Sequence, residues 1–178
     1  MNAGCYGSET WEHVVGVRTI DRSGHVRRRL PADFEVGYRH VALRQGRLGL
    51  DEWFVDGTFR FRSGDGERSR ERIRELLRQR IASQPLGLPN AGSVFRNPPG
   101  DHAARLIESC GLKGHVRGGA RISERHANFI VNPHGVARAA DIEALIDHAR
   151  AVVYEKCGVE LVAEVKIVGE PRADEVSP

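Results

Sequence analysis

A proline- and glycine-rich stretch, residues 84–99, interrupts the hydrophobic pattern of the chain and separates two parts with different patterns. It holds Pro85, three further prolines and two glycines, so neither a helix nor a central strand can run through it. We therefore expect a loop or linker here and a domain boundary near residue 83, which gives domains 1–83 and 84–178. The 178 residues, 40% of them hydrophobic, suffice for one ordinary domain or two small ones.

Before this stretch, apolar residues recur mainly as they do in β-strands. Residues 13–30 predict a hairpin, because the polar turn Asp21-Arg22-Ser23-Gly24 separates two short apolar runs. Residues 53–61 predict a further strand, with apolar side chains mostly at period two. Residues 67–82 predict an amphipathic helix whose apolar stripe consists of Ile73, Leu76, Leu77 and Ile81.

After the stretch, two helices are expected. Asp101 is suited to cap a short helix that Gly111 ends. Asp141 is expected to open a longer helix, because apolar residues follow it at helical spacing and Gly158 lies just past its end.

Short strands are also expected in this second part. Residues 120–123 and 128–132 predict two strands, the segment 132–135 predicts a turn, and residues 160–168 predict a final strand. Strands mixed with segregated helices indicate the α+β fold class.

Charge and cysteine content narrow the functional classes only slightly. With 27 basic and 24 acidic residues the net charge is +3, which suits anionic ligands as well as nucleic acid. Cys5, Cys110 and Cys157 are widely spaced, which argues for a reducing compartment and against a zinc site or a disulfide framework. No apolar run is long enough to span a membrane, so we expect a cytoplasmic protein without a metal or a membrane partner.

The segment 60–80 has eight arginines and raises the question of nucleic-acid binding. Four acidic residues are interleaved with them, and no aromatic residue follows Phe61 in the segment. A solvated amphipathic helix accounts for this pattern better than a phosphate-tracking surface does, so no nucleic-acid partner is expected.

The run Gly92-Ser93-Val94-Phe95-Arg96-Asn97-Pro98 resembles the GSxF[KR]NP segment of the UDP-N-acetylenolpyruvoylglucosamine reductase family. The resemblance extends over essentially the whole chain, since several further motifs follow the family's order. They are residues 2–7, 37–40, 104–108, 111–114, 118–120, 123–132 and 164–169. The SERHANF form at 123–129 is similar to the branch of the family that lacks an extra substrate-capping loop.

The resemblance implies that residues 1–83 are the remainder of an FAD-binding domain of the PCMH type. Residues 84–178 then form a C-terminal α+β substrate-binding domain. Met1 matches an internal position of the family, and no GxGxxG or other phosphate-cradling glycine loop occurs in the sequence. We therefore expect either a truncated product or a start assigned at an internal methionine, and we favour the second.

The reaction implied by the resemblance is reduction of UDP-N-acetylglucosamine enolpyruvate to UDP-N-acetylmuramate with FAD and NADPH as cofactors. It needs a cation near the developing anion and a proton donor over the carbon next to the one that receives hydride. The resemblance assigns the proton donor to Ser93, the cation to Arg39, and a carboxylic acid near the pyruvyl group to Glu164. Ser93 as a small turn residue, Arg39 as a surface arginine and Glu164 on a solvated strand face are the alternatives.

Two further groups of residues are assigned by the same resemblance. The flavin side is expected to include the backbone of Asn2, Ala3 and Gly4 together with Tyr38. The diphosphate and uridine portions of the substrate are expected to contact Arg96, Asn97, His126 and Asn128. A frayed terminus, a buried core tyrosine and an ordinary histidine are the alternatives for Asn2–Gly4, Tyr38 and His126.

One other function remains open from the sequence. Because the pyrophosphate-binding segment is missing, the chain is alternatively a catalytically inactive fragment that binds the UDP-sugar. In the family a proline usually precedes the glutamate at position 164, whereas this chain has Ala163.

Overall fold

The computed structural model describes residues 2–169. These residues divide into two compact units, residues 2–76 (unit 1) and residues 77–169 (unit 2). The division falls inside helix α1, Gly66–Ser83, whereas the sequence placed the boundary at the end of that helix. Helices and strands are mixed as expected, so the α+β prediction is confirmed.

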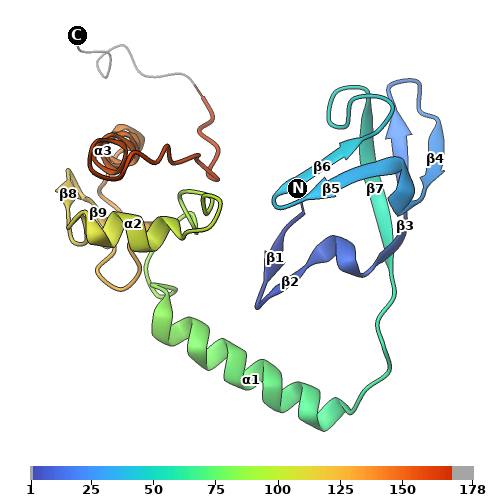
Figure 1. Ribbon diagram of the computed structural model, residues 1–178, viewed down its shortest axis with the longest axis horizontal. Helices are drawn as coiled ribbons and strands as arrows, with labels where there is room; N and C mark the ends of the chain where they lie inside the picture. Colours follow the sequence, from blue (N-terminus) through green and yellow to red (C-terminus); the bar gives the residue numbers. More distant parts are fainter. Residues whose placement is uncertain (1, 170–178) are drawn as a thin grey trace. The chain divides into compact units, whose positions relative to one another are not determined.

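The largest sheet of unit 1 is antiparallel and has β3 between β4 and β7 (Figure 1). β3 spans Val14–Asp21, β4 spans Val26–Arg29 and β7 spans Glu52–Phe59, which confirms the predicted hairpin and the predicted strand. The turn after β3 forms because the Asp21 carboxylate accepts hydrogen bonds from the backbone N–H groups of Ser23 and His25.

Two smaller hairpins in unit 1 were not predicted. β1 (Gly4–Cys5) pairs with β2 (Ser8–Glu9), and β5 (Phe34–Gly37) pairs with β6 (His40–Leu43). Two 3₁₀ turns, Thr10–Glu12 and Pro31–Asp33, precede β3 and β5. These strands are too short to show a hydrophobic period, and the β5–β6 turn lacks the glycine or asparagine that usually marks such turns.

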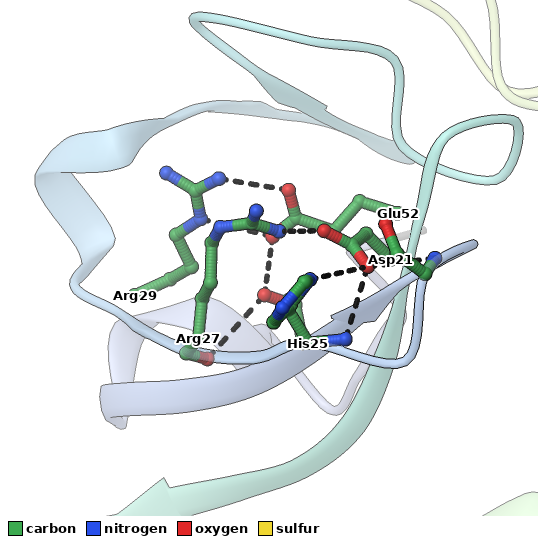
Figure 2. A network of polar contacts seen from close by, with 7 residues as sticks. Asp21, His25, Arg27, Arg29 and Glu52 are labelled. Atoms are coloured by element: carbon green, nitrogen blue, oxygen red, sulfur yellow. Dashed lines mark hydrogen bonds and ion pairs between the residues drawn. The ribbon is translucent and has the colours of Figure 1, made fainter.

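A network of charged side chains joins the ends of β3, β4 and β7 in unit 1 (Figure 2). Glu52 is only 6% exposed and accepts a bidentate pair from Arg29, with Nε–Oε1 and Nη2–Oε2 distances of 2.9 and 2.7 Å. The buried Thr19 hydroxyl also donates to the Glu52 carboxylate. The hydrogen bonds from Arg29, and to a smaller extent the one from Thr19, lower the pKa of Glu52, although burial acts in the opposite direction. The Glu52 carboxylate is therefore charged in the folded unit.

Unit 2 packs two helices, α2 (Ala103–Ser109) and α3 (Ala139–Cys157), with a three-stranded antiparallel sheet of order β10-β9-β8. Its strands are β8 (Val116–Arg117), β9 (Ala120–Ile122) and β10 (Ile130–Val131). The pairing of β9 with β10 confirms the two strands predicted there, and a backbone hydrogen bond from Gly135 to Asn132 confirms the predicted turn.

The helix ends of unit 2 differ in part from the prediction. Asp101 does not cap α2; His102 stands at that position, and the Asp101 carboxylate instead pairs with Arg105. α3 begins before Asp141, whose carboxylate accepts the backbone N–H of Arg138 at 2.9 Å. Gly158 ends α3 in the left-handed region, as predicted.

The predicted final strand at 160–168 is wrong. Only an isolated bridge between Phe95 and Ala163 forms there, with backbone hydrogen bonds from Arg96 to Val162 and from Glu164 to Val94. The segment facing it continues into Pro98-Pro99, which have no N–H to extend a ladder. Within residues 2–169, no helix is both long and apolar enough to cross a bilayer.

Candidate functional site

Arg39 occupies the turn between β5 and β6 in unit 1. The Gly37–His40 pair closes the hairpin and leaves Tyr38 and Arg39 as the turn residues. Arg39 has a φ of 53°, a backbone conformation that costs a non-glycine residue free energy and is often found where a side chain is held for function.

Three groups from the start of the chain hold the Arg39 guanidinium. It donates to the backbone oxygens of Asn2 and Gly4 at 3.3 and 3.4 Å, and it lies 3.5 Å from the Glu9 carboxylate. The ring of Tyr38 lies 5.0 Å from the guanidinium carbon. The Arg39 side chain is 16% exposed, so it is not a freely solvated surface arginine.

The residues expected near the flavin are anchored in unit 1. Asn2 is buried, donates to the Gly37 oxygen at 3.2 Å and accepts from the Trp11 N–H at 3.1 Å. The Ala3 oxygen accepts from the Thr10 N–H at 3.0 Å. The alternative of a frayed terminus is therefore wrong for residues 2–4, and Tyr38, which is 50% exposed, is not a core tyrosine.

Gly4 is packed too closely for any larger residue. A Cβ atom at this position would lie 2.5 Å from the Ser8 oxygen and 2.7 Å from the Glu9 carboxyl group. An open pocket of about 500 Å³ adjoins the β1–β2 hairpin and lies within unit 1. It is lined by Ala3, Gly4, Cys5, Ser8, Glu9, Thr10, His13, Phe59 and Phe61.

In unit 2, the segment 92–97 is held from two sides. On one side, Asn128 is 3% exposed; its side-chain oxygen accepts from the Phe95 N–H at 2.9 Å, and its side-chain nitrogen donates to the Phe95 oxygen at 2.8 Å. The Asn128 backbone oxygen also accepts from the Val94 N–H at 2.9 Å. Asn128 therefore positions the backbone that carries Ser93. From the sequence, Asn128 itself was expected to contact the substrate.

On the other side, Glu164 lies next to the same segment, because its N–H donates to the Val94 oxygen at 2.8 Å. Ser93 and Glu164 are thus brought together at the level of the backbone, and both are half-buried. The bonds around the bridge use the N–H groups of Arg96 and Glu164 and do not use that of Ala163. A proline at position 163 would fit the same pairing, so the departure from the family's proline leaves this geometry intact.

Asn97 and Arg96 continue the segment beyond Phe95. Asn97 is exposed, and its side-chain oxygen accepts from the Ala103 N–H at 3.1 Å, so it ties the motif to the first turn of α2. Arg96 is half-buried, and its Nε is enclosed without a hydrogen-bond partner within residues 2–169.

His126 lies in the loop 123–129, which also contains Asn128, the residue that is hydrogen-bonded to Phe95. Its ring packs edge-on against Phe129, with centroids 4.8 Å apart, and its Nδ1 is enclosed without a hydrogen-bond partner in the described part of the chain. Burial lowers the pKa of His126, and Lys113 adds to the effect, so the neutral imidazole is favoured.

Three buried side-chain atoms in the described chain have no hydrogen-bond partner: Glu9 Oε2, Arg96 Nε and His126 Nδ1. Buried polar atoms normally have a hydrogen-bond partner, so an atom without one is a candidate contact for a ligand. Two of them belong to predicted substrate contacts, and the third belongs to the residue that pairs with Arg39.

The sequence reasoning missed Glu9. Glu9 lies beyond the family motif at residues 2–7, and the β1–β2 hairpin that pairs Glu9 with Gly4 is too short to show a hydrophobic period. Arg39 belongs to unit 1, and Ser93 and Glu164 belong to unit 2, so their convergence stays a prediction. Among residues 2–169, no group of three or more His, Cys, Asp or Glu side chains is arranged to hold a metal ion.

The fold and these two groups of anchored polar residues define the class: an α+β protein with one candidate site surface on each unit. Residues 84–168 match the family model described as UDP-N-acetylenolpyruvoylglucosamine reductase, C-terminal domain. The chain belongs to the UDP-N-acetylenolpyruvoylglucosamine reductase family.

Individual relatives agree with this assignment. The chain is 60% identical to the UDP-N-acetylenolpyruvoylglucosamine reductase of Thiobacillus denitrificans over 96% of its own length and 51% of the relative's. It is 54% identical to that of Legionella pneumophila strain Paris, over 96% of the chain and 54% of the relative. The crystal structure of the enzyme from Thermus caldophilus matches with a TM-score of 0.73 and 34% identity, over 90% of this chain and 56% of that one. The chain spans about half the length of the curated relatives it matches.

Proposed function

We propose that this chain provides the substrate-binding domain and part of the flavin-facing surface of a reductase. The substrate is UDP-N-acetylglucosamine enolpyruvate, the product is UDP-N-acetylmuramate, the cofactors are FAD and NADPH, and the reaction takes place in the cytoplasm. The observation that carries the proposal is the pair of unpartnered buried atoms, Arg96 Nε and His126 Nδ1, in a chain of this family. Each of these enclosed atoms is a candidate contact for a polar ligand once its side chain turns toward that ligand.

The residues of unit 1 fit the ring end of a flavin. The pocket beside Ala3 and Gly4 includes the aromatic residues Phe59 and Phe61 in its lining, which suits a planar ring system. When bound, FAD that has been reduced by NADPH supplies the hydride for the double bond. The sequence offers no glycine-rich loop for the pyrophosphate, so the fit extends only to the ring portion.

The chain's own residues then provide binding and proton transfer. Arg39, permanently charged and already held by Asn2, Gly4 and Glu9, pairs with the substrate carboxylate and with the enolate that develops from it. Ser93 holds a proton at its Oγ and donates it to the carbon next to the one that receives hydride. Glu164 stabilises the same end of the substrate through a hydrogen bond, while Asn128 keeps the segment 92–97 in place.

A binding experiment tests the substrate half of the proposal. Titration calorimetry with UDP-N-acetylglucosamine enolpyruvate should give a measurable affinity for the purified chain. Arg96→Gln should weaken it on the order of 10- to 100-fold, because a charge-assisted hydrogen bond contributes about 1.5–3 kcal/mol. Arg150→Gln, which changes an arginine paired with Asp147 on α3, is the matched control and should leave the affinity unchanged. Equal affinities for both variants would show that Arg96 does not contact the ligand.

Flavin absorbance and NADPH oxidation test the catalytic half. In a protein that binds FAD, Ser93→Ala should leave reduction of the flavin by NADPH intact and slow its reoxidation by substrate severely. If both half-reactions fell together, Ser93 would not be the proton donor. A colourless chain that nevertheless binds the UDP-sugar would favour the alternative function, a binding fragment without catalysis.

A further inference from the structure

Two of the three cysteines, far apart in sequence, meet in unit 2. Cys110 follows the last turn of α2 and Cys157 is the last residue of α3, and their Sγ atoms lie 3.7 Å apart. The sequence had treated the cysteines as dispersed thiols, because 47 positions separate these two. The two thiols are unbonded in the structure, since a disulfide bond is about 2.05 Å long, but their sulfur atoms are in direct contact.

The surroundings of the two thiols are unequal. Cys110 is 7% exposed, whereas Cys157 is exposed. The pKa of the Cys110 thiol is raised by burial and then by its contact with Cys157. Cys157 is close enough to Arg105 to contribute, after Asp101, to the raised pKa of that guanidinium, and the Lys156 ammonium donates to the Cys110 oxygen at 3.2 Å. Cys157 is therefore the thiol that a small disulfide in solution can reach, and Cys110 is shielded from it.

We propose that Cys110 and Cys157 form a dithiol site that a small disulfide, such as oxidised glutathione, converts into an intrachain disulfide. The exposed Cys157 thiolate attacks one sulfur of the small disulfide and expels one thiolate, which gives a mixed disulfide. The Cys110 thiol then loses its proton and attacks Sγ of Cys157, expelling the second thiolate. Overall the two protein thiols are oxidised by two electrons, and one small disulfide is reduced to two thiols.

The bond would join the C-terminal ends of α2 and α3. It would close a loop that contains the whole β10-β9-β8 sheet, together with His126 and Asn128. Because a cross-link restricts the unfolded chain, oxidation should raise the unfolding midpoint of unit 2. This inference depends only on the thiol geometry and stands or falls independently of the proposed function.

The test uses the full chain with Cys5→Ser, which removes the exposed thiol of unit 1. After incubation with oxidised glutathione and alkylation of the remaining thiols, intact-mass spectrometry should show loss of two hydrogens, no glutathione adduct and no alkylation. A reductant should restore two alkylatable thiols. Peptide mapping should place the bond between Cys110 and Cys157.

Two variants in the same background trap the steps. Cys110→Ser should stop at a stable glutathione adduct on Cys157. Cys157→Ser, a change at an exposed position, should leave the buried Cys110 largely unmodified over the same time. Two free thiols, glutathione on both cysteines, or disulfide-linked dimers in place of the intrachain bond would overturn the proposal.

Discussion

The two units bury very different amounts of apolar surface. In the described residues, the core of unit 2 is a cluster of sixteen buried side chains contributed by both helices, the sheet and the segment 92–97. The corresponding cluster in unit 1 has four: Val14, Val17, Phe34 and Leu43. Several large apolar side chains on β7, including Phe54, Val55 and Phe59, remain 42–49% exposed.

Unit 1 makes up part of this difference with directional polar contacts. The Arg29–Glu52 pair, with Thr19 as a further donor, links the three strands of the largest sheet in unit 1. A buried carboxylate costs solvation free energy and is tolerated only while its partners are in place. The stability of unit 2 should therefore fall most when a buried apolar side chain is truncated. The stability of unit 1 should fall most when a charged side chain of this network is neutralised.

The units can be followed separately in solution. Both tryptophans, Trp11 and Trp53, lie in unit 1, and Trp11 packs on Phe34 with ring centroids 4.8 Å apart. Two of the three α-helices, α2 and α3, lie in unit 2. Tryptophan fluorescence consequently reports on unit 1, while the helical circular dichroism signal reports mainly on unit 2.

The largest effect is expected from Leu145→Ala in unit 2. Leu145 is 1% exposed in the middle of α3, and truncation of such a residue costs about 2–5 kcal/mol in the free energy of unfolding. Denaturant unfolding should show the helical transition at clearly lower denaturant. Val136→Ala, at a valine that is 68% exposed, is the control and should change the midpoint little. An equal shift in the tryptophan transition would contradict the view that each unit has its own core.

Glu52→Gln should give the next largest effect, this time in unit 1. It leaves the Arg29 guanidinium, 24% exposed, without its carboxylate, and the expected cost is about 1–3 kcal/mol because water partly reaches the arginine. The tryptophan transition should move and the helical transition should not.

Asp56→Asn is the matched control on the same strand. Asp56 pairs with Arg18 on the surface, where the two side chains are 42% and 59% exposed, and such pairs contribute about 0–1 kcal/mol. If both variants lost the same stability, the buried network would not be what holds unit 1 together.

The sequence predicted those elements whose side chains repeat over enough residues to show a period. β3, β7 and α1 belong to this group, as does α3 with its glycine end. The motif 92–98 also led to residues that do lie together, since Ser93, Asn128 and Glu164 are connected through the backbone of Val94 and Phe95.

What the sequence did not predict depends on contacts between distant segments. The turn that carries Arg39 has no local sequence signal. The positive φ of Arg39 accompanies contacts of its side chain with Asn2 and Gly4, which are distant in sequence. The prediction of a final strand at residues 160–168 was wrong because the segment that faces it continues into Pro98 and Pro99. The Cys110–Cys157 pair follows from the packing of α2 against α3, which spacing alone does not indicate.

The smallest expected effect distinguishes the units by pH. In unit 2 the rings of His115 and His148 stack with centroids 4.4 Å apart, and burial, then the neighbouring His115, lowers the pKa of His148 below its ordinary value near 6.5. The unfolded chain therefore binds more protons, so the stability of unit 2 should be fully present above about pH 6.5 and decline as the pH falls below it. His148→Asn should make this decline shallower in the helical transition, with the remainder due to His126, whose pKa burial also lowers. His134→Asn, at an exposed histidine of the same unit, should leave the decline unchanged. A decline of equal slope in both variants would show that His148 is not responsible, and a decline confined to the tryptophan signal would locate the pH dependence in unit 1.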